Sequence, residues 1–404
     1  MYSARIIEIR NLRKHKYADR LQCTEIDGYN IIVGEDVRVG QRMVFFPIGG
    51  QLSEEFCKEN RLLREVDAKG RRTGGGYVHP VRRNIAPLRL HGEVSEGLLL
   101  PLEVLAKYTD ISKLREEENF SCVNGVEICR FYDSGEFVID QETWEIKKYI
   151  ERRRDRPYTM YVPWGVERIG TSAFDGNRKI SRVIIPGSVE GVGHAAFRSC
   201  ASLESVTLQQ GVREIAGSAF AECPLLRQVF LPESLLRIGP SPFEGSENLE
   251  SLSIPKNVKA NLEYSIFETV TRDGITVDKE NPDYTWEDDV LLNSDRTRLL
   301  YYPRRRKDTS YFIPCFIRSI GSAAFYKVNH LCEVVIPNGV TEIMNNTFCE
   351  CENLSVVTIP KSVTEIGDMA FFACRKLLKI RGVKGSEAER FAKKRKTAFE
   401  VIME

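Results

Sequence analysis

The sequence predicts a multidomain, mostly β protein in which a small β-barrel is followed by a solenoid of 23-residue repeats. Two sequence markers recur with a 23-residue step after about residue 160. Short alternating apolar stretches, separated by Gly and Asp-Gly, fill the first 110 residues or so. The chain has 404 residues, which is enough for two or three domains at roughly 150 residues per domain.

Composition excludes several classes of protein. Lys and Arg number 58 and Asp and Glu 57, so bulk charge does not drive the chain onto nucleic acid or a membrane. An electrostatic partner therefore needs a local patch. The sequence has no apolar run of about 18 residues and no secretory signal, and its eleven cysteines are scattered. These features predict a cytoplasmic protein with reduced thiols and no membrane contact.

The first part, residues 1–112, is predicted to be the barrel. Asp27-Gly28 separates two alternating stretches and is a strong hairpin signal. The stretches that we expect to be strands are residues 5–9, 21–26, 29–33, 43–46 and 94–100. Five short strands in about 100 residues indicate a small barrel, of which the OB-fold is one kind.

Two segments of this part carry a family resemblance. Lys14-His15-Lys16-Tyr17-Ala18-Asp19-Arg20-Leu21 and the stretch 88–100 resemble motifs of tRNA-binding OB domains. Residues 1–155, with a close counterpart at 44–63, are also similar to the N-terminal OB module of bacterial and phage RNA ligases. The resemblance implies an OB-fold that binds RNA, possibly tRNA-like or nicked.

The same resemblance raises the question of catalysis. In such ligases a second domain follows, with a Lys-x-Asp-Gly nucleophile that forms a lysyl-adenylate. The nearest match here is Arg272-Asp273-Gly274, and arginine stays protonated and cannot attack. We therefore expect no catalytic residues, no metal and no cofactor in this chain.

Residues 61–90 hold eight Lys and Arg against two acidic residues, and residues 74–76 are three glycines. This composition predicts a mobile basic loop that contacts phosphates. The alternative for this segment is a solvated loop whose arginines contact no ligand. For Ser95, the alternative is that it only shapes a strand turn. The residues predicted to bind nucleic acid are Lys14, Lys16, Arg20, Arg71, Arg72, Arg82, Arg83, Arg89 and Ser95.

Residues 113–159 are predicted to be a linker. The stretches 125–129 and 136–139 alternate like a small hairpin. Residues 144–156 contain six Lys and Arg and are expected to form a short basic helix.

After residue 160 each unit reads roughly Leu-x-x-Val-x-Ile-Pro-x-x-Val-x-x-Ile-Gly-x-x-Ala-Phe-x-x-Cys. The aromatic of the Ala-Phe marker falls at Phe174, Phe197, Phe220, Phe243, Phe325, Phe348 and Phe371. The alternating stretch before the proline suits a short strand, which the proline ends because it has no N–H. One unit alone cannot bury its apolar residues, whereas stacked units can, which predicts a solenoid.

The pattern resembles the BspA-type leucine-rich repeat family over about residues 160–404. The resemblance implies a curved, right-handed solenoid with a parallel sheet. Residues 270–312 break the period and are expected to form one or two hairpins, after a degenerate fifth unit at Ser265-Ile266-Phe267. Residues 385–404 have a helical pattern and then a strand pattern, as in a C-terminal cap.

Four cysteines share one repeat position. Stacking would bring Cys200 near Cys223 and Cys351 near Cys374, which allows a metal or redox pair. The alternative, which we favour, is a small buried residue that fills a turn.

Three functions follow from these patterns. The first is a non-enzymatic binding protein whose OB module holds RNA and whose solenoid holds a protein partner on its sheet face. The second is a purely protein-binding or surface adhesion protein. The third is a nucleic-acid repair factor that acts with a separate catalytic subunit.

Overall fold

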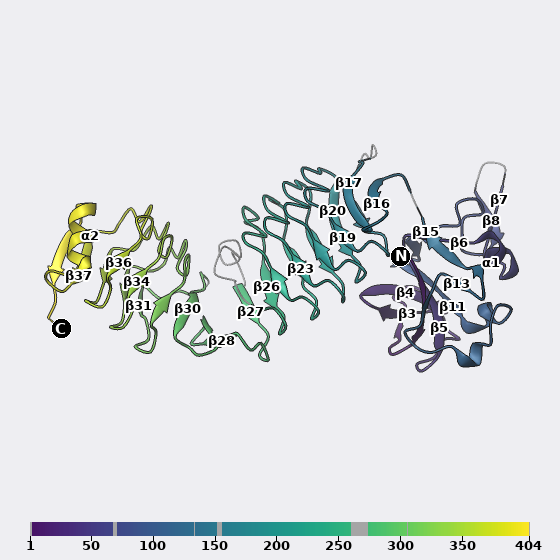
Figure 1. Cartoon of the computed structure of the whole chain (residues 1–404), viewed down its shortest axis with the longest axis horizontal. Helices are drawn as coiled ribbons and strands as arrows, with labels where there is room; N and C mark the ends of the chain where they lie inside the picture. Colours follow the sequence, from purple (N-terminus) through teal and green to yellow (C-terminus); the bar gives the residue numbers. More distant parts are fainter. Residues whose placement is uncertain are drawn as a thin grey trace.

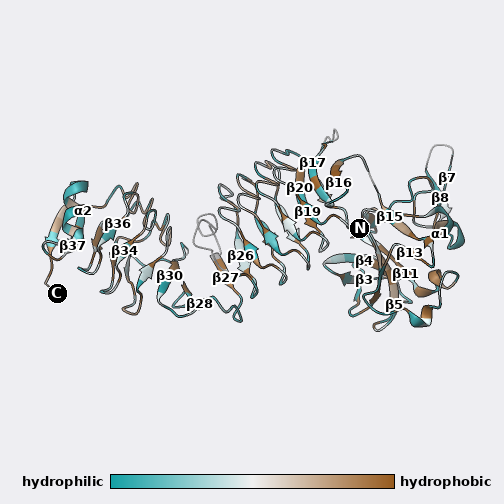
Figure 2. Cartoon of the chain, viewed as in Figure 1, coloured by the Kyte–Doolittle hydropathy of each residue, from teal (hydrophilic) through white to brown (hydrophobic). Residues whose placement is uncertain are grey.

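A computed structural model describes residues 2–67, 71–132, 134–151, 156–259, 274–304 and 306–403. The chain is elongated, with an N-terminal module (residues 2–132) at one end and a row of stacked repeats that leads to a helix near the C-terminus (Figure 1). Figure 2 shows hydrophobic residues along strands of both parts and a hydrophilic C-terminal helix.

The N-terminal module consists of short antiparallel strands. Its largest sheet has the order β11 (Gly97–Pro101), β5 (Arg42–Pro47), β1 (Ala4–Glu8) and β12 (Asn119–Phe120). A second sheet contains β2 (Arg13–Lys14), β3 (Leu21–Ile26) and β4 (Tyr29–Gly34). The two-stranded pairs are β9 (Leu88–Leu90) with β10 (Glu93–Ser95), β7 (Arg64–Val66) with β8 (Arg72–Gly75), β13 (Cys122–Val123) with β14 (Val126–Glu127), and β6 (Gly50–Leu52) with β15 (Cys129–Phe131). Helix α1 (Glu54–Glu59) and two 3-10 turns (Leu102–Leu105 and Ile111–Lys113) complete it.

The predicted hairpin of the module is confirmed. Strands β3 and β4 pair in antiparallel register with Ile26 opposite Tyr29, and Asp27 and Gly28 have φ values of 50° and 80°. Positive φ at both turn residues is what a two-residue hairpin turn requires. The strands of the module lie in several sheets, so the closed OB barrel stays a prediction.

The predicted linker, residues 113–159, is divided between the N-terminal module and the solenoid. Strand β12 pairs with β1 and strand β15 pairs with β6, so residues up to 131 complete the module. Strands β16 (Phe137–Asp140) and β17 (Glu145–Tyr149) form a hairpin at the start of the solenoid.

The predicted basic helix over 144–156 is wrong. Residues 145–149 are strand β17, which pairs in parallel with β19 (Arg168–Ile169), and residues 152–155 lie outside the described part. The physical reason is that the first repeat would otherwise expose an open sheet edge, which the hairpin covers. Ile146 and Tyr149 are buried in the repeat core, so apolar burial outweighs the basic side.

Each repeat gives one strand to each of two parallel sheets. In the first half, the long-strand sheet contains β18 (Tyr158–Tyr161), β20 (Ile180–Ile185), β22 (Ser205–Leu208), β24 (Gln228–Phe230), β26 (Ser251–Ile254) and β27 (Gly274–Val277). The short-strand sheet contains β16, β17, β19, β21 (Gly191–Val192), β23 (Glu214–Ile215) and β25 (Arg237–Ile238). The predicted degenerate unit at 265–267 and the start of the insertion at 270–273 lie outside the described residues.

The second half repeats this plan. One sheet contains β28 (Tyr284–Glu287), β29 (Val290–Asn293), β30 (Arg298–Tyr301), β32 (Ser319–Ile320), β34 (Glu342–Ile343) and β36 (Glu365–Ile366). The other contains β31 (Ser310–Phe312), β33 (Glu333–Val335), β35 (Val356–Thr358), β37 (Lys379–Gly382) and β38 (Ala398–Val401). Strands β28, β29 and β30 pair as two successive hairpins, as predicted for the insertion. Helix α2 (Glu387–Arg395) and β38 match the predicted cap, and β38 covers the edge of β37.

The repeat marker aromatics form two stacked columns inside the solenoid. The Phe174 and Phe197 ring centroids are 4.5 Å apart, and those of Phe348 and Phe371 are 5.1 Å apart. Each ring buries its faces against the rings of neighbouring repeats, so the repeats stabilise one another along the column. Neither α1 nor α2, the helices in the described part, is long and apolar enough to span a bilayer.

The module packs directly on the first repeats. The Tyr161 hydroxyl donates to Glu96 at 3.0 Å, and Ile184 of β20 is buried within the module's core. A Cβ at Gly49 would lie 2.8 Å from the Cβ of Pro163. Such close contact orients the module on the solenoid.

Candidate functional site

Two of the resembling segments meet on the surface of the module. The Arg13 guanidinium pairs with Glu93 at 2.7 Å, and the Lys16 backbone N–H donates to the same carboxylate at 2.9 Å. His15 lies 3.2 Å from the Leu90 carbonyl oxygen. The β2–β3 loop is therefore fixed against the β9–β10 turn.

Glu93 is the anchor of this arrangement. Hydrogen bonds from the Arg13 side chain and the Lys16 backbone lower the pKa of Glu93 to about 2. Its ionised carboxylate neutralises Arg13. Lys14 and Arg20 are exposed, and no described residue forms an ion pair with either of them.

An exposed aromatic ring lies beside Lys16. Tyr17 is 60% exposed, with the Lys16 ammonium 5.1 Å from its ring centroid. Arg89 donates to the Gly92 carbonyl at 3.2 Å, and a Cβ at Gly92 would lie 3.3 Å from the Tyr17 ring. Lys14, Lys16, Tyr17, Arg20 and Arg89 are called the basic surface below.

Part of the basic loop predicted over 61–90 has regular structure. Residues 64–66 and 72–75 pair as a hairpin, and residues 68–70 lie outside the described part. Arg71 pairs with Asp67 at 2.8 Å, whereas Arg72 donates to two glycine carbonyls and lies 6.0 Å from the Tyr77 ring. Arg82 is exposed.

Two predicted contact residues have structural roles instead. The Arg83 side chain, 19% exposed, donates to the Leu52 carbonyl and pairs with Glu54 at 3.4 Å. Ser95 is buried, where its hydroxyl accepts from the Ile32 N–H at 3.1 Å and donates to the Gly97 carbonyl at 3.3 Å. Its hydroxyl is used to join β4 to β11, so we withdraw Ser95 and Arg83 as RNA contacts.

An apolar cavity of about 290 Å³ is lined mainly by residues of β4 and β11. Leu21, which follows Arg20, and Leu88, which precedes Arg89, line it together with Tyr77. Tyr77 is 53% exposed. Two exposed tyrosines, each beside a cation, are the elements of a stacking platform for single-stranded nucleic acid.

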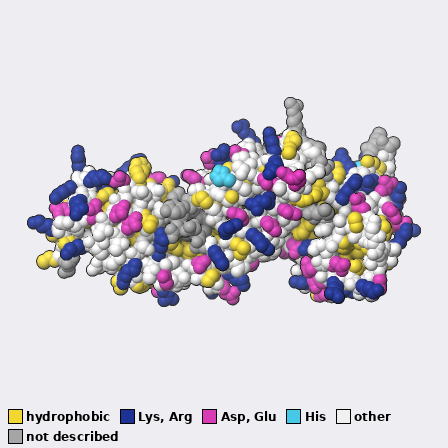
Figure 3. All heavy atoms as spheres, viewed as in Figure 1, with side chains coloured by type: hydrophobic (Ala, Val, Ile, Leu, Met, Phe, Trp, Pro, Cys, Tyr) yellow, Lys and Arg dark blue, Asp and Glu magenta, His cyan; other side chains and the backbone are white. Residues whose placement is uncertain are grey.

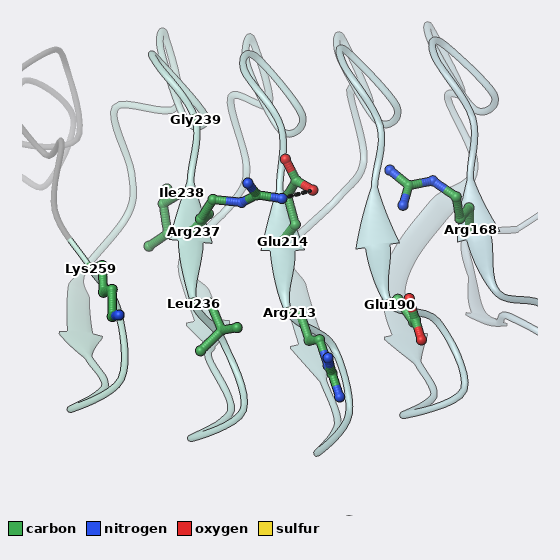
Figure 4. A pocket seen from close by; sticks show the side chains of 9 residues that line it. All are labelled: Arg168, Glu190, Arg213, Glu214, Leu236, Arg237, Ile238, Gly239 and Lys259. Atoms are coloured by element: carbon green, nitrogen blue, oxygen red, sulfur yellow. Dashed lines mark hydrogen bonds and ion pairs between the residues drawn. The ribbon is translucent and has the colours of Figure 1, made fainter.

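The repeats carry a second candidate site that sequence reasoning missed. A groove of about 750 Å³ crosses the short-strand sheet of the first half (Figure 4). Its lining, called the charged groove below, is Arg168, Glu190, Arg213, Glu214, Leu236, Arg237, Ile238, Gly239 and Lys259. The sequence does contain charged residues of this groove at 23-residue spacing. Only the strand register, however, shows that these residues lie next to one another. Elsewhere on the face in Figure 3, acidic and basic side chains are interspersed.

The repeat cysteines are structural, as we favoured. The Cys223 thiol donates to the Phe197 carbonyl at 3.2 Å, and Cys374 donates to the Phe348 carbonyl at 2.9 Å. The Cys223 side chain and burial raise the pKa of the Cys200 thiol, which keeps it protonated. Within the described residues no three His, Cys, Asp or Glu side chains are placed to hold a metal ion.

The repeats match a known family. The model of the BspA type leucine rich repeat region matches residues 158–272 and 306–388, in six copies. A leucine-rich repeat protein from Eubacterium ventriosum is similar to 60% of this chain and 66% of its own, with 25% identity and a TM-score of 0.52. The pneumococcal vaccine antigen PcpA is similar over 61% of this chain and 65% of its own, with 22% identity and a TM-score of 0.49.

The chain thus spans just under two thirds of each of these proteins. An RNA ligase from Naegleria gruberi aligns with 35% of this chain and 38% of its own, with 17% identity. Its TM-score is 0.24. No curated protein matches the chain.

Proposed function

Because residues 158–272 and 306–388 form a leucine-rich repeat region of the BspA type, we propose a non-enzymatic scaffold protein. Its N-terminal module binds single-stranded RNA, and its repeats bind a protein partner. The observation that carries RNA binding is the basic surface, where the Lys16 ammonium lies 5.1 Å from the exposed ring of Tyr17 and the neighbouring Lys14 and Arg20 are exposed.

The chemistry of that surface fits a flexible RNA strand. Arg and Lys neutralise phosphates, and an exposed aromatic ring stacks on an unpaired base at about 1–3 kcal/mol per base. A duplex keeps its bases stacked inside and cannot use Tyr17 in this way. We therefore expect the ligand to be an unpaired RNA segment, which is narrower than the tRNA-like or nicked RNA expected from the sequence.

The test compares matched variants of the full chain by fluorescence anisotropy with labelled single-stranded RNA. Lys16→Glu with Arg20→Glu is expected to weaken RNA binding by about tenfold or more, because both phosphate contacts are lost. Arg178→Glu with Arg227→Glu is the control, since both arginines are exposed on the repeats and outside the charged groove. Equal affinity of all three proteins would reject RNA binding at the basic surface.

A purely protein-binding role is the second candidate. The charged groove favours it, because it offers a recessed surface on the repeats independently of the module. If neither RNA nor a nicked duplex binds the full chain, the module only covers the end of the solenoid. Protein binding by the repeats is then the remaining function.

A further inference from the structure

We propose that the charged groove binds an acidic, extended segment of the partner protein. This inference rests on the proposed function, namely that the repeats bind a protein, and names the surface and the chemistry of the partner.

Strand register builds the groove from two rows of side chains. In the first row, Arg168, Gly191, Glu214 and Arg237 are successive partners in the parallel short-strand sheet. In the second row, backbone hydrogen bonds of 2.8–3.0 Å link Glu190, Arg213, Leu236 and Lys259. Neighbouring strands are about 4.8 Å apart, so each row presents one side chain at that interval. Figure 4 shows both rows along the sheet.

The groove keeps an excess of positive charge. Arg237 pairs with Glu214 at 3.1 Å, so these two neutralise each other. Arg168, Arg213 and Lys259 are exposed, and no described residue forms an ion pair with any of them. Glu190 is the remaining carboxylate in the lining. Three cations against one carboxylate favour a ligand that brings at least two negative charges.

Gly191 leaves room for the Arg168 side chain within the first row. Its φ is not positive, and the aligned positions hold Arg168, Glu214 and Arg237, so the backbone does not require glycine there. A Cβ at Gly191 would lie 3.1–3.4 Å from the guanidinium of Arg168. The missing side chain lets the Arg168 guanidinium lie over Gly191 and extend along the row towards Glu214, whereas a larger side chain at 191 would displace it.

This charge is local to the first half of the solenoid. The aligned row of the second half holds Arg298, Ser319, Glu342 and Glu365, so it has one cation and two carboxylates where the first-half row has two cations and one carboxylate. The repeat consensus therefore does not require the cations of the first half, and their accumulation there needs another explanation. Recognition of an acidic ligand supplies one.

The lining favours a peptide over a nucleic acid. Leu236 is 40% exposed between the cations, whereas the lining contains no aromatic ring on which a base could stack. A peptide supplies both carboxylates and apolar side chains. Arg168 and Arg213 are two repeats apart, or about 10 Å, which an extended peptide covers in about three residues.

The first experiment uses a fluorescein-labelled octaglutamate peptide and the full chain in anisotropy. Arg168→Glu with Arg213→Glu, and separately Gly191→Leu, are each expected to weaken binding by about tenfold or more. Arg178→Glu with Arg227→Glu carries the same charge change outside the groove and should change affinity less than about twofold. Equal weakening by this control, or no binding by the unmodified chain, would overturn the assignment, as would displacement of the peptide from the groove by single-stranded RNA.

A second experiment separates this inference from the proposed function. A photo-crosslinking amino acid replaces Leu236 in the groove or Phe230, which is 56% exposed on the long-strand sheet. Crosslinking of an acidic partner segment at position 236 supports the inference. Crosslinking at position 230 alone would reject the groove as the binding site but would still support protein binding by the repeats. Absence of crosslinks at both positions contradicts both.

Discussion

The Arg5 guanidinium carbon lies 5.0 Å from the ring centroid of Trp164 and so joins the first strand of the module to the first repeat. Arg5 also pairs with Asp27, and its side chain is only 10% exposed. Burial lowers the pKa of Arg5, but the neighbouring carboxylates keep it charged. We therefore expect the module and the solenoid to unfold as coupled parts.

Trp164→Ala is expected to weaken this coupling. Loss of the half-buried indole removes the Arg5 contact and apolar area, at a cost of about 2 kcal/mol in the free energy of unfolding. Urea unfolding measures the stability, and amide exchange should rise in both β1 and β18. Tyr77→Ala, at an exposed ring distant from this junction, is the control. Unchanged exchange in β1 would contradict a packed junction.

Cys223 should tolerate serine better than alanine. Ser246 occupies the same position one repeat later, and its hydroxyl donates to the Phe220 carbonyl at 3.0 Å as the Cys223 thiol does to Phe197. Cys223→Ser keeps a donor, whereas Cys223→Ala leaves a buried carbonyl unpaired at about 1–2 kcal/mol. Thermal unfolding of the two variants checks this order. The reverse order would mean that the thiol contributes only volume.

Acid should loosen the basic surface through Glu93. Its pKa is depressed in the folded protein to about 2 from 4.5, so it stabilises the fold above its unfolded pKa. That contribution is lost as the pH falls from about 4.5 towards 2. Glu93→Gln should therefore show a smaller loss of stability over that range than the unmodified chain. Urea unfolding in a pH series measures it, and parallel curves would contradict the prediction.

Gly50→Ala should be strongly destabilising. A Cβ there would lie 1.9 Å from the ring of Tyr2, which is fully buried and whose hydroxyl donates to the Pro47 carbonyl at 2.6 Å. Neither group has room to move, so we expect a loss of about 3 kcal/mol or failure to fold. Gly40→Ala is a useful comparison, because nothing lies within 4 Å of its Cβ position and only its positive φ of 84° opposes the change. Similar stability of the two variants would contradict the packing around Tyr2.

The repeat part could be predicted from sequence because its signal is periodic. A single marker such as Phe197 fixes both a stacked ring and the strand before it, and the cap at α2 follows ordinary helix and strand patterns. The helix predicted over 144–156 was wrong because the prediction relied on local charge. It did not consider that a strand is needed there to cover the edge of β19. The prediction that Ser95 contacts RNA was wrong because its motif does not show whether its hydroxyl faces solvent or another strand.

The charged groove could not be predicted for a different reason. Glu190 and Arg213 are 23 residues apart and adjoin only through the strand register, and the position of Arg168 depends on the missing side chain at Gly191. Neither property is visible in composition. The basic surface is an intermediate case, since its cations were predicted, but Tyr17 was not, and the loop that places Lys16 beside Tyr17 is held by Glu93.

The central claim, that the module binds single-stranded RNA at the basic surface, is tested most directly by the salt dependence of RNA binding to the full chain. If about three to four phosphates contact Lys14, Lys16, Arg20 and Arg89, the logarithm of the binding constant should fall with the logarithm of salt concentration with a slope of about −2 to −3. Lys16→Glu with Arg20→Glu should reduce that slope towards −1. No binding at low salt, or a slope that these substitutions leave unchanged, would contradict the account.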